Sequence, residues 1–244
     1  MTEPASIAVV VGVTGGLGGA LAKTLGVQAR YDKVVGLARR RPDDWPDSPD
    51  WPFITADVLK EQDLAAAAKV LSALGALDRV VVATGLLHGE GVTPEKTMRS
   101  LNASTLAELF AVNAVAPALV AKHLLPLTPK TRPSVFAALS ARVGSISDNR
   151  LGGWYGYRAS KAALNMLIAT LAIEHRRQRP LGVCVSLHPG TVQTDLSAPF
   201  RKAGADDTVF SPEHSAQALA AVMDGLGADD NGGFFAWDGS RIEW

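Results

Sequence analysis

The segment from residue 7 to residue 25 constrains the fold of this 244-residue chain more than any other. Residues 7–11 form a short apolar, β-branched run, which is typical of a fully buried strand. Glycines at 12, 16 and 18 follow and predict a turn. Leucines at helical spacing begin at residue 17, within this glycine-rich segment. In a strand, turn and helix of this kind, missing side chains let a pyrophosphate approach the backbone, and the helix N-terminus offers free N–H groups. The segment predicts a phosphate-binding turn; a tight turn without a ligand is the alternative.

Strand-like and helix-like segments alternate along the rest of the chain, with no break that would mark a second domain. Such alternation predicts a parallel sheet with helices on both faces. A length of 244 residues fits one α/β domain with a large core. We therefore expect one Rossmann-like, doubly wound domain over residues 1–244. The expected strands are 7–11, 33–38, 52–55, 78–83, 134–139, 181–187 and 233–236, and the main expected helices are 63–74, 105–125, 155–178 and 212–226.

The second expected strand ends in three consecutive arginines, at residues 39–41. In a dinucleotide-binding fold this strand end faces the adenine ribose. An acidic residue there binds a free 2′-hydroxyl, whereas an arginine accommodates a 2′-phosphate. Because Arg39 takes this place, the sequence favours NADP over NAD as the cofactor. The alternative is a solvated basic turn, which suits Arg40 and Arg41 better than Arg39.

Tyr157 and Lys161 stand four residues apart in a helical pattern, so their side chains share one helix face. A free phenol, with a pKa of about 10, is a poor acid at neutral pH. A nearby ammonium favours the phenolate and lowers that pKa, which makes proton exchange with a substrate oxygen feasible. The alternative is an ordinary amphipathic helix with a packed tyrosine and a solvated lysine. The pair becomes a candidate catalytic site only together with the glycine turn.

Composition excludes several classes of function. The chain has 24 acidic and 24 basic residues, so nothing indicates a nucleic acid or an acidic membrane as partner. The single cysteine, Cys184, lies in a strand-like segment and is expected to be a buried thiol. We expect no metal site. The sequence shows no charged-then-apolar leader and no apolar run that we judge long enough to span a bilayer, so we expect a cytoplasmic protein.

These motifs together resemble the short-chain dehydrogenase/reductase superfamily over essentially the full length. The chain looks most similar to the C-factor and sniffer-like carbonyl reductases, through residues 142–146, 157–165 and 237–244. The resemblance implies that Tyr157 and Lys161 contact both substrate and cofactor. It also implies that Asn113 holds a water-linked proton relay to the lysine. The cofactor contacts that it implies are Gly12, Thr14, Gly15, Gly16, Leu17, Gly18, Asp57, Val58, Gly85, Pro189, Gly190, Val192 and Thr194.

The chain also departs from the family pattern. The usual Asn-Asn-Ala-Gly after the fourth strand reads Val-Ala-Thr-Gly at residues 82–85, which keeps Gly85 but loses both amides. The usual catalytic serine position is Ala141. Ser140 is one residue away, and Ser145 lies twelve residues before Tyr157, close to the usual separation. Either could supply the hydroxyl; we lean slightly to Ser140, with Ser147 a distant third.

The resemblance implies hydride transfer between NADP and a carbonyl or secondary alcohol, with Tyr157 as general acid and base. A dinucleotide-binding regulatory or signalling protein is the alternative, favoured by the alanine at 141. A third possible function is epimerisation or dehydration of a substrate on the same fold. Substrate recognition is expected from segments 86–94, 146–154 and 195–210, with Arg201 and Lys202 meeting an anionic group or solvent. The resemblance also implies a homodimer or homotetramer, formed through the two long helices.

Overall fold

Seven parallel strands form the central sheet of the computed structural model, which describes residues 4–200 and 209–244. The strand order is β3-β2-β1-β4-β5-β6-β9, so the chain starts inside the sheet, builds one half and crosses over to build the other. This order is that of doubly wound Rossmann-like folds and confirms the predicted fold class. The strands are β1 (Ser6–Val11), β2 (Lys33–Ala38), β3 (Phe53–Thr55), β4 (Ala76–Val82), β5 (Ser134–Leu139), β6 (Gly182–His188) and β9 (Phe234–Ala236).

The strand β1 shows how the sheet builds a core on each side. Its residues from 7 to 11 are all apolar and fully buried. Because successive side chains of a strand point to opposite faces, Ile7, Val9 and Val11 belong to one core cluster, and Ala8 and Val10 belong to the other. Burial on both faces explains why the strand reads as a continuous apolar run.

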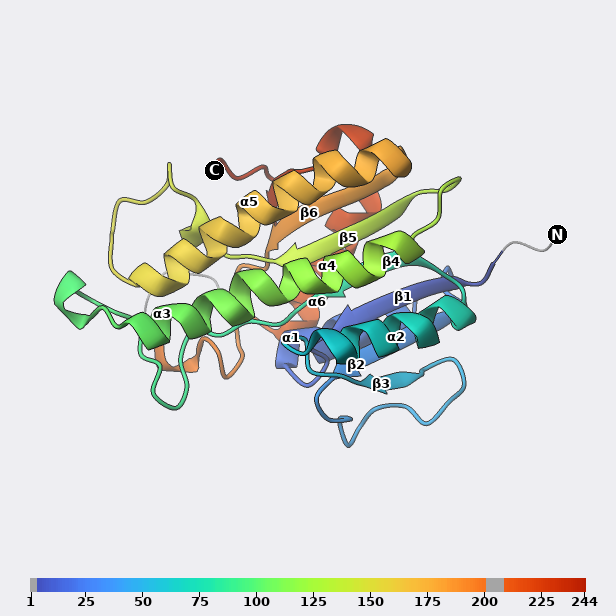
Figure 1. Cartoon of the computed structure of the whole chain (residues 1–244), viewed down its shortest axis with the longest axis horizontal. Coiled ribbons are helices and arrows are strands. Elements are labelled where there is room, and N and C mark those ends of the chain that lie inside the picture. Colours follow the sequence, from blue (N-terminus) through green and yellow to red (C-terminus); the bar gives the residue numbers. More distant parts are fainter. Residues whose placement is uncertain (1–3, 201–208) are drawn as a thin grey trace.

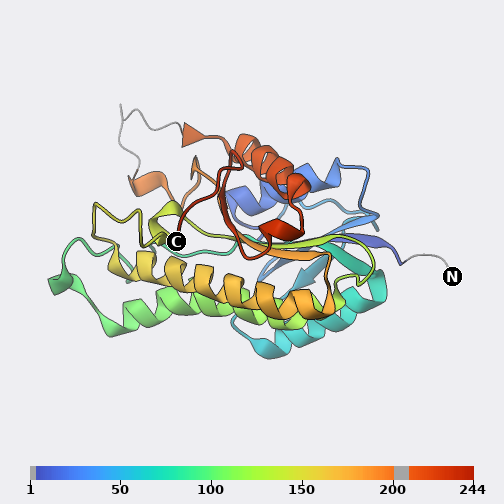
Figure 2. The same ribbon diagram turned by 90° about the horizontal axis from the view of Figure 1, so that it is seen from above.

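The helices cover both faces of the sheet (Figure 1 and Figure 2). One face carries α2, α4 and α5, and the opposite face carries α1 and α6, which pack against each other. The predicted start of α6 is confirmed, since Ser211 accepts a hydrogen bond from the His214 amide and Pro212 follows. The helices are α1 (Gly16–Gly26), α2 (Glu61–Leu74), α3 (Ala103–Phe110), α4 (Ala116–Leu124), α5 (Tyr155–Gln178) and α6 (Pro212–Gly225).

The helix predicted over residues 105–125 is present but irregular. One π-helical turn, Ala111–Val115, joins α3 to α4. The segment Ala103–Leu127 is long and apolar enough, by length and composition, to cross a membrane, so the expectation that the chain holds no such run is wrong. In this fold its inward face, with Val120 and Leu124, is buried in the core beside the sheet. Because 33% of the most apolar stretch of this segment is buried, the packing accounts for part of its apolar composition.

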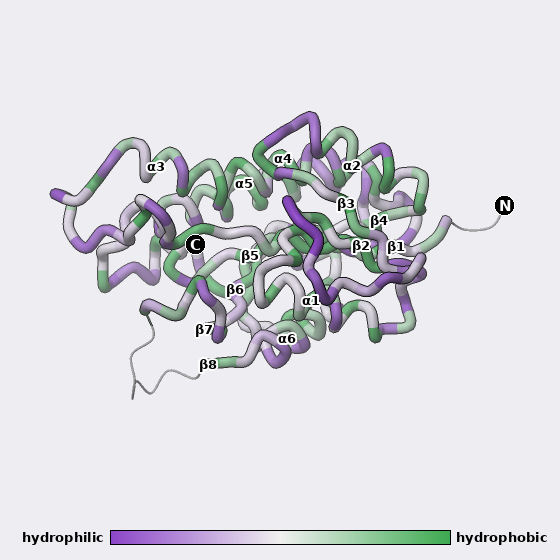
Figure 3. The backbone as a smooth tube through the Cα atoms, turned by 90° about the horizontal axis from the view of Figure 1, so that it is seen from below, coloured by the Kyte–Doolittle hydropathy of each residue, from purple (hydrophilic) through white to green (hydrophobic). Residues whose placement is uncertain are grey.

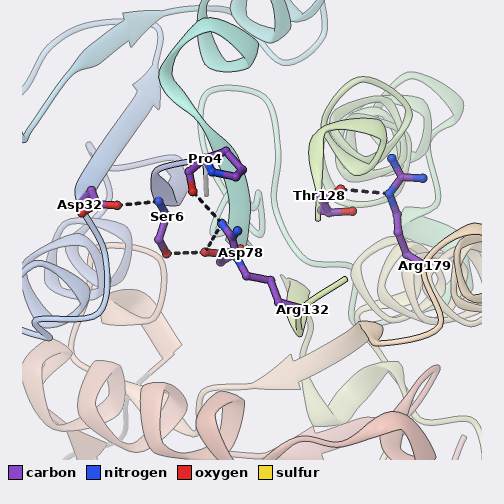
Figure 4. A network of polar contacts seen from close by, with 7 residues as sticks. All are labelled: Pro4, Ser6, Asp32, Asp78, Thr128, Arg132 and Arg179. Atoms are coloured by element: carbon purple, nitrogen blue, oxygen red, sulfur yellow. Dashed lines mark hydrogen bonds and ion pairs between the residues drawn. The ribbon is translucent and has the colours of Figure 1, made fainter. Parts of the chain in front are cut away.

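Polar contacts close the edge of the sheet where the strands begin (Figure 4). Arg132 donates hydrogen bonds of 2.8 and 3.0 Å to the Asp78 carboxylate, and the Ser6 hydroxyl bonds the same carboxylate. Arg179 donates to the Thr128 carbonyl at 3.1 Å. Hydrophilic residues gather in the peripheral loops, and hydrophobic ones prevail in the strands and inward helix faces (Figure 3). The predicted site residues gather at the opposite edge, where the strands end.

Candidate active site

Tyr157 and Lys161 lie in the first two turns of α5 and are buried, with exposed fractions of 7% and 3%. The Lys161 Nζ lies 5.8 Å from the centroid of the Tyr157 ring. It donates a hydrogen bond of 2.8 Å to the carbonyl of Leu139, the last residue of β5. The helix therefore holds a phenol and an amine together at the carboxyl end of the sheet.

Burial controls the acidity of this pair. It raises the pKa of the Tyr157 phenol above 10.0 and lowers the pKa of Lys161 from 10.5 to about 8. Both shifts arise because a charged group is unfavourable where water is excluded. From the sequence we expect the lysine to lower the phenol pKa; the structure shows the opposite direction, because the phenol is buried away from water. At neutral pH Tyr157 is a protonated phenol, which suits a proton donor.

Asn113 lies in the π-helical turn and is fully buried. Its Oδ1 accepts from the Leu86 amide at 2.8 Å, and its Nδ2 donates to the Leu86 carbonyl at 2.8 Å and to the Ser160 hydroxyl at 3.0 Å. One amide hydrogen thus braces the turn after β4, and the other ties Asn113 to Ser160 of α5. A β-carbon on Gly85 would lie 3.7 Å from the Asn113 Oδ1 and 3.8 Å from the Lys161 Nζ. The structure brings these three predicted residues together; the proton relay stays a prediction.

The two candidate serines are held in different ways. The Ser140 hydroxyl donates to the Asn165 Oδ1 at 2.7 Å, and both groups are buried. The Ser145 hydroxyl accepts from the Asp148 amide at 3.2 Å and lies 3.3 Å from the Ser147 hydroxyl. Ser140 has therefore committed its only proton to Asn165, whereas the proton of Ser145 can be redirected.

The turn before Ser145 packs directly on α5. Residues Arg142–Gly144 form one 3₁₀ turn, and a β-carbon on Gly144 would lie only 2.8 Å from the Lys161 Cβ. Gly144 is therefore needed for this close approach. Ser145 is the next residue after this turn, so its hydroxyl lies close to the part of α5 that carries Lys161. Ala141, which stands at the usual serine position, is the residue before this turn.

The glycine turn between β1 and α1 has the shape of an anion cradle. Gly12 has a φ of +91°, and a β-carbon on Gly18 would lie 2.2 Å from the Gly12 carbonyl oxygen, so only glycines close this turn. The helix α1 has no side-chain cap and no acidic residue in its first turn, which leaves N–H groups for an anion. Thr14, Gly15 and Gly16 are exposed there, whereas the Leu17 side chain is packed in the core.

Two further segments meet this turn. A β-carbon on Gly16 would lie 3.3 Å from the Thr194 Cγ2, and one on Gly12 would lie 3.1 Å from the Thr84 Cγ2. The Thr84 Oγ1 is buried and has no hydrogen-bond partner among residues 4–200 and 209–244. An unpaired buried hydroxyl beside a glycine cradle fits a site that a polar ligand completes. The residues present therefore fit a bound dinucleotide.

The predicted adenine end of the site lies at neighbouring strand ends. Arg39 follows β2 and is exposed, and among the described residues it forms no ion pair, whereas Arg41 pairs with Asp47. Ala38 of β2 is in register with Thr55 of β3, so the segment after Thr55 lies beside Arg39. That segment is ordered by Asp57, whose Oδ1 accepts from the Leu59 amide at 3.1 Å, and Val58 is partly buried.

The Pro189-Gly190 loop follows β6 as predicted. Gly190 has a φ of +78°, and the Pro189 carbonyl accepts from the Ser215 hydroxyl at 2.8 Å. Beyond it, β7 (Thr191–Val192) pairs with β8 (Val209–Phe210), a contact that the sequence did not predict. Val192 is buried and Thr194 is partly exposed toward the glycine turn. The loop therefore closes one side of the candidate cofactor site.

Aromatic rings join the three segments that we expect to bind substrate. The ring of Trp154 lies edge-on to Tyr157 at 6.3 Å and to Phe200 at 5.0 Å between centroids. The ring of His88 lies 5.4 Å from that of Phe200. Segments 86–94, 146–154 and 195–200 thus meet beside Tyr157. Arg201 and Lys202, also expected there, lie outside the described residues.

Thr84 and Glu95 are two residues of the site that the sequence does not predict. Glu95 is a buried carboxylate, 3% exposed, in the loop before α3, and its Oε2 accepts from the Gly156 amide at the start of α5. A single acidic residue in a polar loop has no periodicity that would mark it as buried. The only sequence signal at Thr84 was its place in the altered family motif.

Residues 6–205 match the short chain dehydrogenase family, and the chain belongs to that family. As the resemblance predicts, it is similar to the C-signal protein of Myxococcus xanthus, with 37% identity over 140 residues, or 57% of this chain and 78% of that protein. It is 30% identical to 1-hydroxy-2-glutathionyl-2-methyl-3-butene dehydrogenase of Rhodococcus sp. (strain AD45) over 188 residues, which cover 77% of this chain and 78% of that one. The family and the Rhodococcus dehydrogenase support oxidoreduction with a nicotinamide cofactor.

Solved structures agree. Carbonyl reductase Sniffer of D. melanogaster superposes with a TM-score of 0.85 and 25% identity, over 98% of this chain and 99% of that one. A short-chain dehydrogenase/reductase from Burkholderia multivorans with bound NADP superposes with a TM-score of 0.79 and 26% identity, over 99% and 100% of the two chains. The predicted membership of the family and the likeness to sniffer-like reductases are confirmed.

Proposed function

We propose that this protein is an NADP-dependent reductase of carbonyl compounds, in which Tyr157 donates the proton. The observation that carries the proposal is the buried pair of Tyr157 and Lys161 beside Gly85, at the end of the sheet that holds the glycine cradle. An acid in a water-excluding site, next to a dinucleotide cradle, is what reduction of a carbonyl requires.

Each residue has a defined part in this reaction. The nicotinamide, when bound, supplies the hydride. Because burial keeps Tyr157 protonated, its phenol donates the proton to the carbonyl oxygen as negative charge develops there. Lys161, with a pKa of about 8, is mostly an ammonium at pH 7 and stabilises the phenolate that is left. Ser145, whose proton is not committed, would hydrogen-bond the carbonyl oxygen. Asn113 holds the backbone at Leu86 and thereby fixes the neighbouring Gly85, which lies beside the Lys161 amine.

The preference for NADP rests on Arg39. Its guanidinium is exposed at the end of β2, has no ion-pair partner in the described chain, and lies beside the segment after β3. A 2′-phosphate would supply the missing anion through a charge-assisted contact. A bound NADP in the similar Burkholderia multivorans structure is consistent with this choice.

The proposal extends to assembly and location. We propose a homodimer or homotetramer, because apolar side chains on the outer face of the long helices are exposed: Met166 by 68%, Ile173 by 63% and Val115 by 47%. A second copy would cover them. A small-molecule substrate and a cytoplasmic location complete the proposal, with no nucleic-acid or membrane partner.

A second candidate function is nucleotide-dependent signalling with little turnover. It is favoured by Ala141 at the usual serine position, by the commitment of Ser140 to Asn165, and by the similarity to C-signal. The two functions predict different results for the variant Tyr157→Phe. A reductase loses its turnover in this variant, whereas a signalling protein has little turnover to lose.

The test measures carbonyl-dependent NADPH oxidation and, separately, NADPH binding by fluorescence. Removing the proton donor should lower turnover by about 10²-fold or more and change the NADPH dissociation constant by less than about threefold. Tyr155→Phe is the matched control, since Tyr155 is on the same helix turn and is exposed. If a broad carbonyl panel gives no turnover with the wild-type protein while NADPH binds tightly, the signalling function replaces the reductase.

A further inference from the structure

The turn that leads into α5 has an unusual backbone. Gly152, Gly153 and Trp154 all have positive φ values, of 62°, 67° and 51°. Trp154 is the only residue other than glycine with a positive φ in the described part of the chain. A bulky side chain is sterically disfavoured in this region, so the surrounding structure must hold it there.

Glu95 supplies that hold through two different groups. Its main-chain carbonyl accepts a hydrogen bond from the Trp154 amide, and its Oε2 accepts from the Gly156 amide at 3.2 Å. No side chain of the turn itself caps α5, and the first turn of the helix has no acidic residue. Glu95 therefore acts as the N-terminal cap of α5 from a loop about sixty residues earlier in the chain.

The fit around this carboxylate is close. A β-carbon on Gly156 would lie 2.9 Å from the Glu95 Oε1, 2.6 Å from the Leu109 Cδ1 and 3.0 Å from the Leu106 Cδ2. Only glycine lets the carboxylate and α3 approach the helix start this closely. The backbone of the turn is also tied from the helix side, since Arg158 donates through its Nε to the Gly153 carbonyl at 3.0 Å.

The consequence of this arrangement is the position of the Trp154 ring. The left-handed backbone places the ring between those of Tyr157 and Phe200. His88, which lies against Phe200, is fixed by a 3.0 Å contact between its Nε2 and the Asp195 carbonyl. These rings form an aromatic wall next to the candidate proton donor.

We propose that Glu95 is a positioning residue: it holds the turn 152–154 so that the Trp154 ring forms a wall beside Tyr157, and it thereby favours carbonyl compounds with a flat aryl group over small aliphatic ones. This inference rests on the proposed reductase function. Aromatic rings pack edge-on or offset against an aryl substrate, and this contact is lost when the Trp154 ring is displaced.

The test compares kcat/KM for 4-nitrobenzaldehyde with kcat/KM for propanal, with NADPH as cofactor. The ratio of the two values does not depend on how much of a preparation is active, so a merely structural loss leaves it unchanged. In Glu95→Ala the ratio should fall at least about fivefold, and Trp154→Ala should lower it in the same direction. In Glu95→Gln, which keeps an acceptor oxygen for the Gly156 amide, it should stay within about twofold of wild type.

Two controls complete the design. Glu108→Ala removes an exposed carboxylate from α3 and should leave the ratio unchanged. If Glu95→Ala does not fold, Glu95→Met replaces it, because methionine fills a similar volume and offers no acceptor oxygen to the Gly156 amide. A wild-type protein that reduces neither aldehyde refutes the proposed function. An active wild type whose ratio is unchanged in Glu95→Ala, or in Glu95→Met if that variant is used, refutes the role of Glu95 alone.

Discussion

Replacing Lys161 by methionine should stabilise the protein at pH 7 while abolishing its chemistry. Lys161 is 3% exposed, and burial lowers its pKa from 10.5 to about 8. Since one pKa unit corresponds to about 1.4 kcal/mol, burying this amine costs about 3 kcal/mol at pH 7. The variant also loses the hydrogen bond to the Leu139 carbonyl, worth about 1 kcal/mol. A net gain of about 2 kcal/mol in the free energy of unfolding is therefore expected.

The pH dependence gives the sharper form of this prediction. The folded-state pKa of Lys161 lies below the unfolded value, so the unfolded chain binds more protons between about pH 8 and 10.5, and the wild type becomes more stable as pH rises through this window. The advantage of Lys161→Met should accordingly shrink from about 2 kcal/mol at pH 7 to about zero at pH 10.

The assay is urea unfolding followed by tryptophan fluorescence at pH 7, 8.5 and 10. Lys96→Met, at an exposed position, serves as the control and should show no such trend. A difference between Lys161→Met and wild type that stays constant from pH 7 to 10 would refute the reasoning. So would a variant that is less stable than wild type at pH 7.

Three further predictions concern the choice of cofactor, the catalytic serine and stability in acid. Arg39→Asp should raise KM for NADPH by about tenfold or more and lower it for NADH, as steady-state kinetics with both cofactors will show. Ser145→Ala should reduce kcat more than Ser140→Ala does, and equal losses would contradict the assignment to Ser145. Burial and the charge of Arg179 lower the pKa of His175 from 6.5 to about 4, so the wild type loses stability as pH falls from 6.5 toward 4. His175→Gln should lose less over that range in acid unfolding followed by circular dichroism.

The strands and the two motifs were predictable because their signals are local. A strand buried on both faces, such as residues 7–11, has to be a continuous apolar run, and a pyrophosphate turn needs glycines where the backbone comes close. The predicted helix 155–178 has the same first and last residues as α5. In each case the residues that determine the structure are neighbours in the sequence.

The features that escaped prediction depend on contacts between distant segments. The π-helical turn at Asn113 exists where its amide reaches the backbone of Leu86, and no local pattern indicates that bond. The left-handed Trp154 depends on Glu95, which is far away in the chain. The direction of the Tyr157 pKa shift depends on burial, which emerges only when the helices pack on the sheet.

The transfer of a labelled hydride, with and without the Tyr157 hydroxyl, tests the central claim most directly. Reduced NADP carrying deuterium on the transferable C4 position is mixed with the wild-type protein and 4-nitrobenzaldehyde, and the alcohol is analysed by mass spectrometry and NMR. We predict one deuterium on the former carbonyl carbon, formed at a rate that falls about 10²-fold or more in Tyr157→Phe. Alcohol without the label, or labelled alcohol formed equally fast by that variant, would contradict the account.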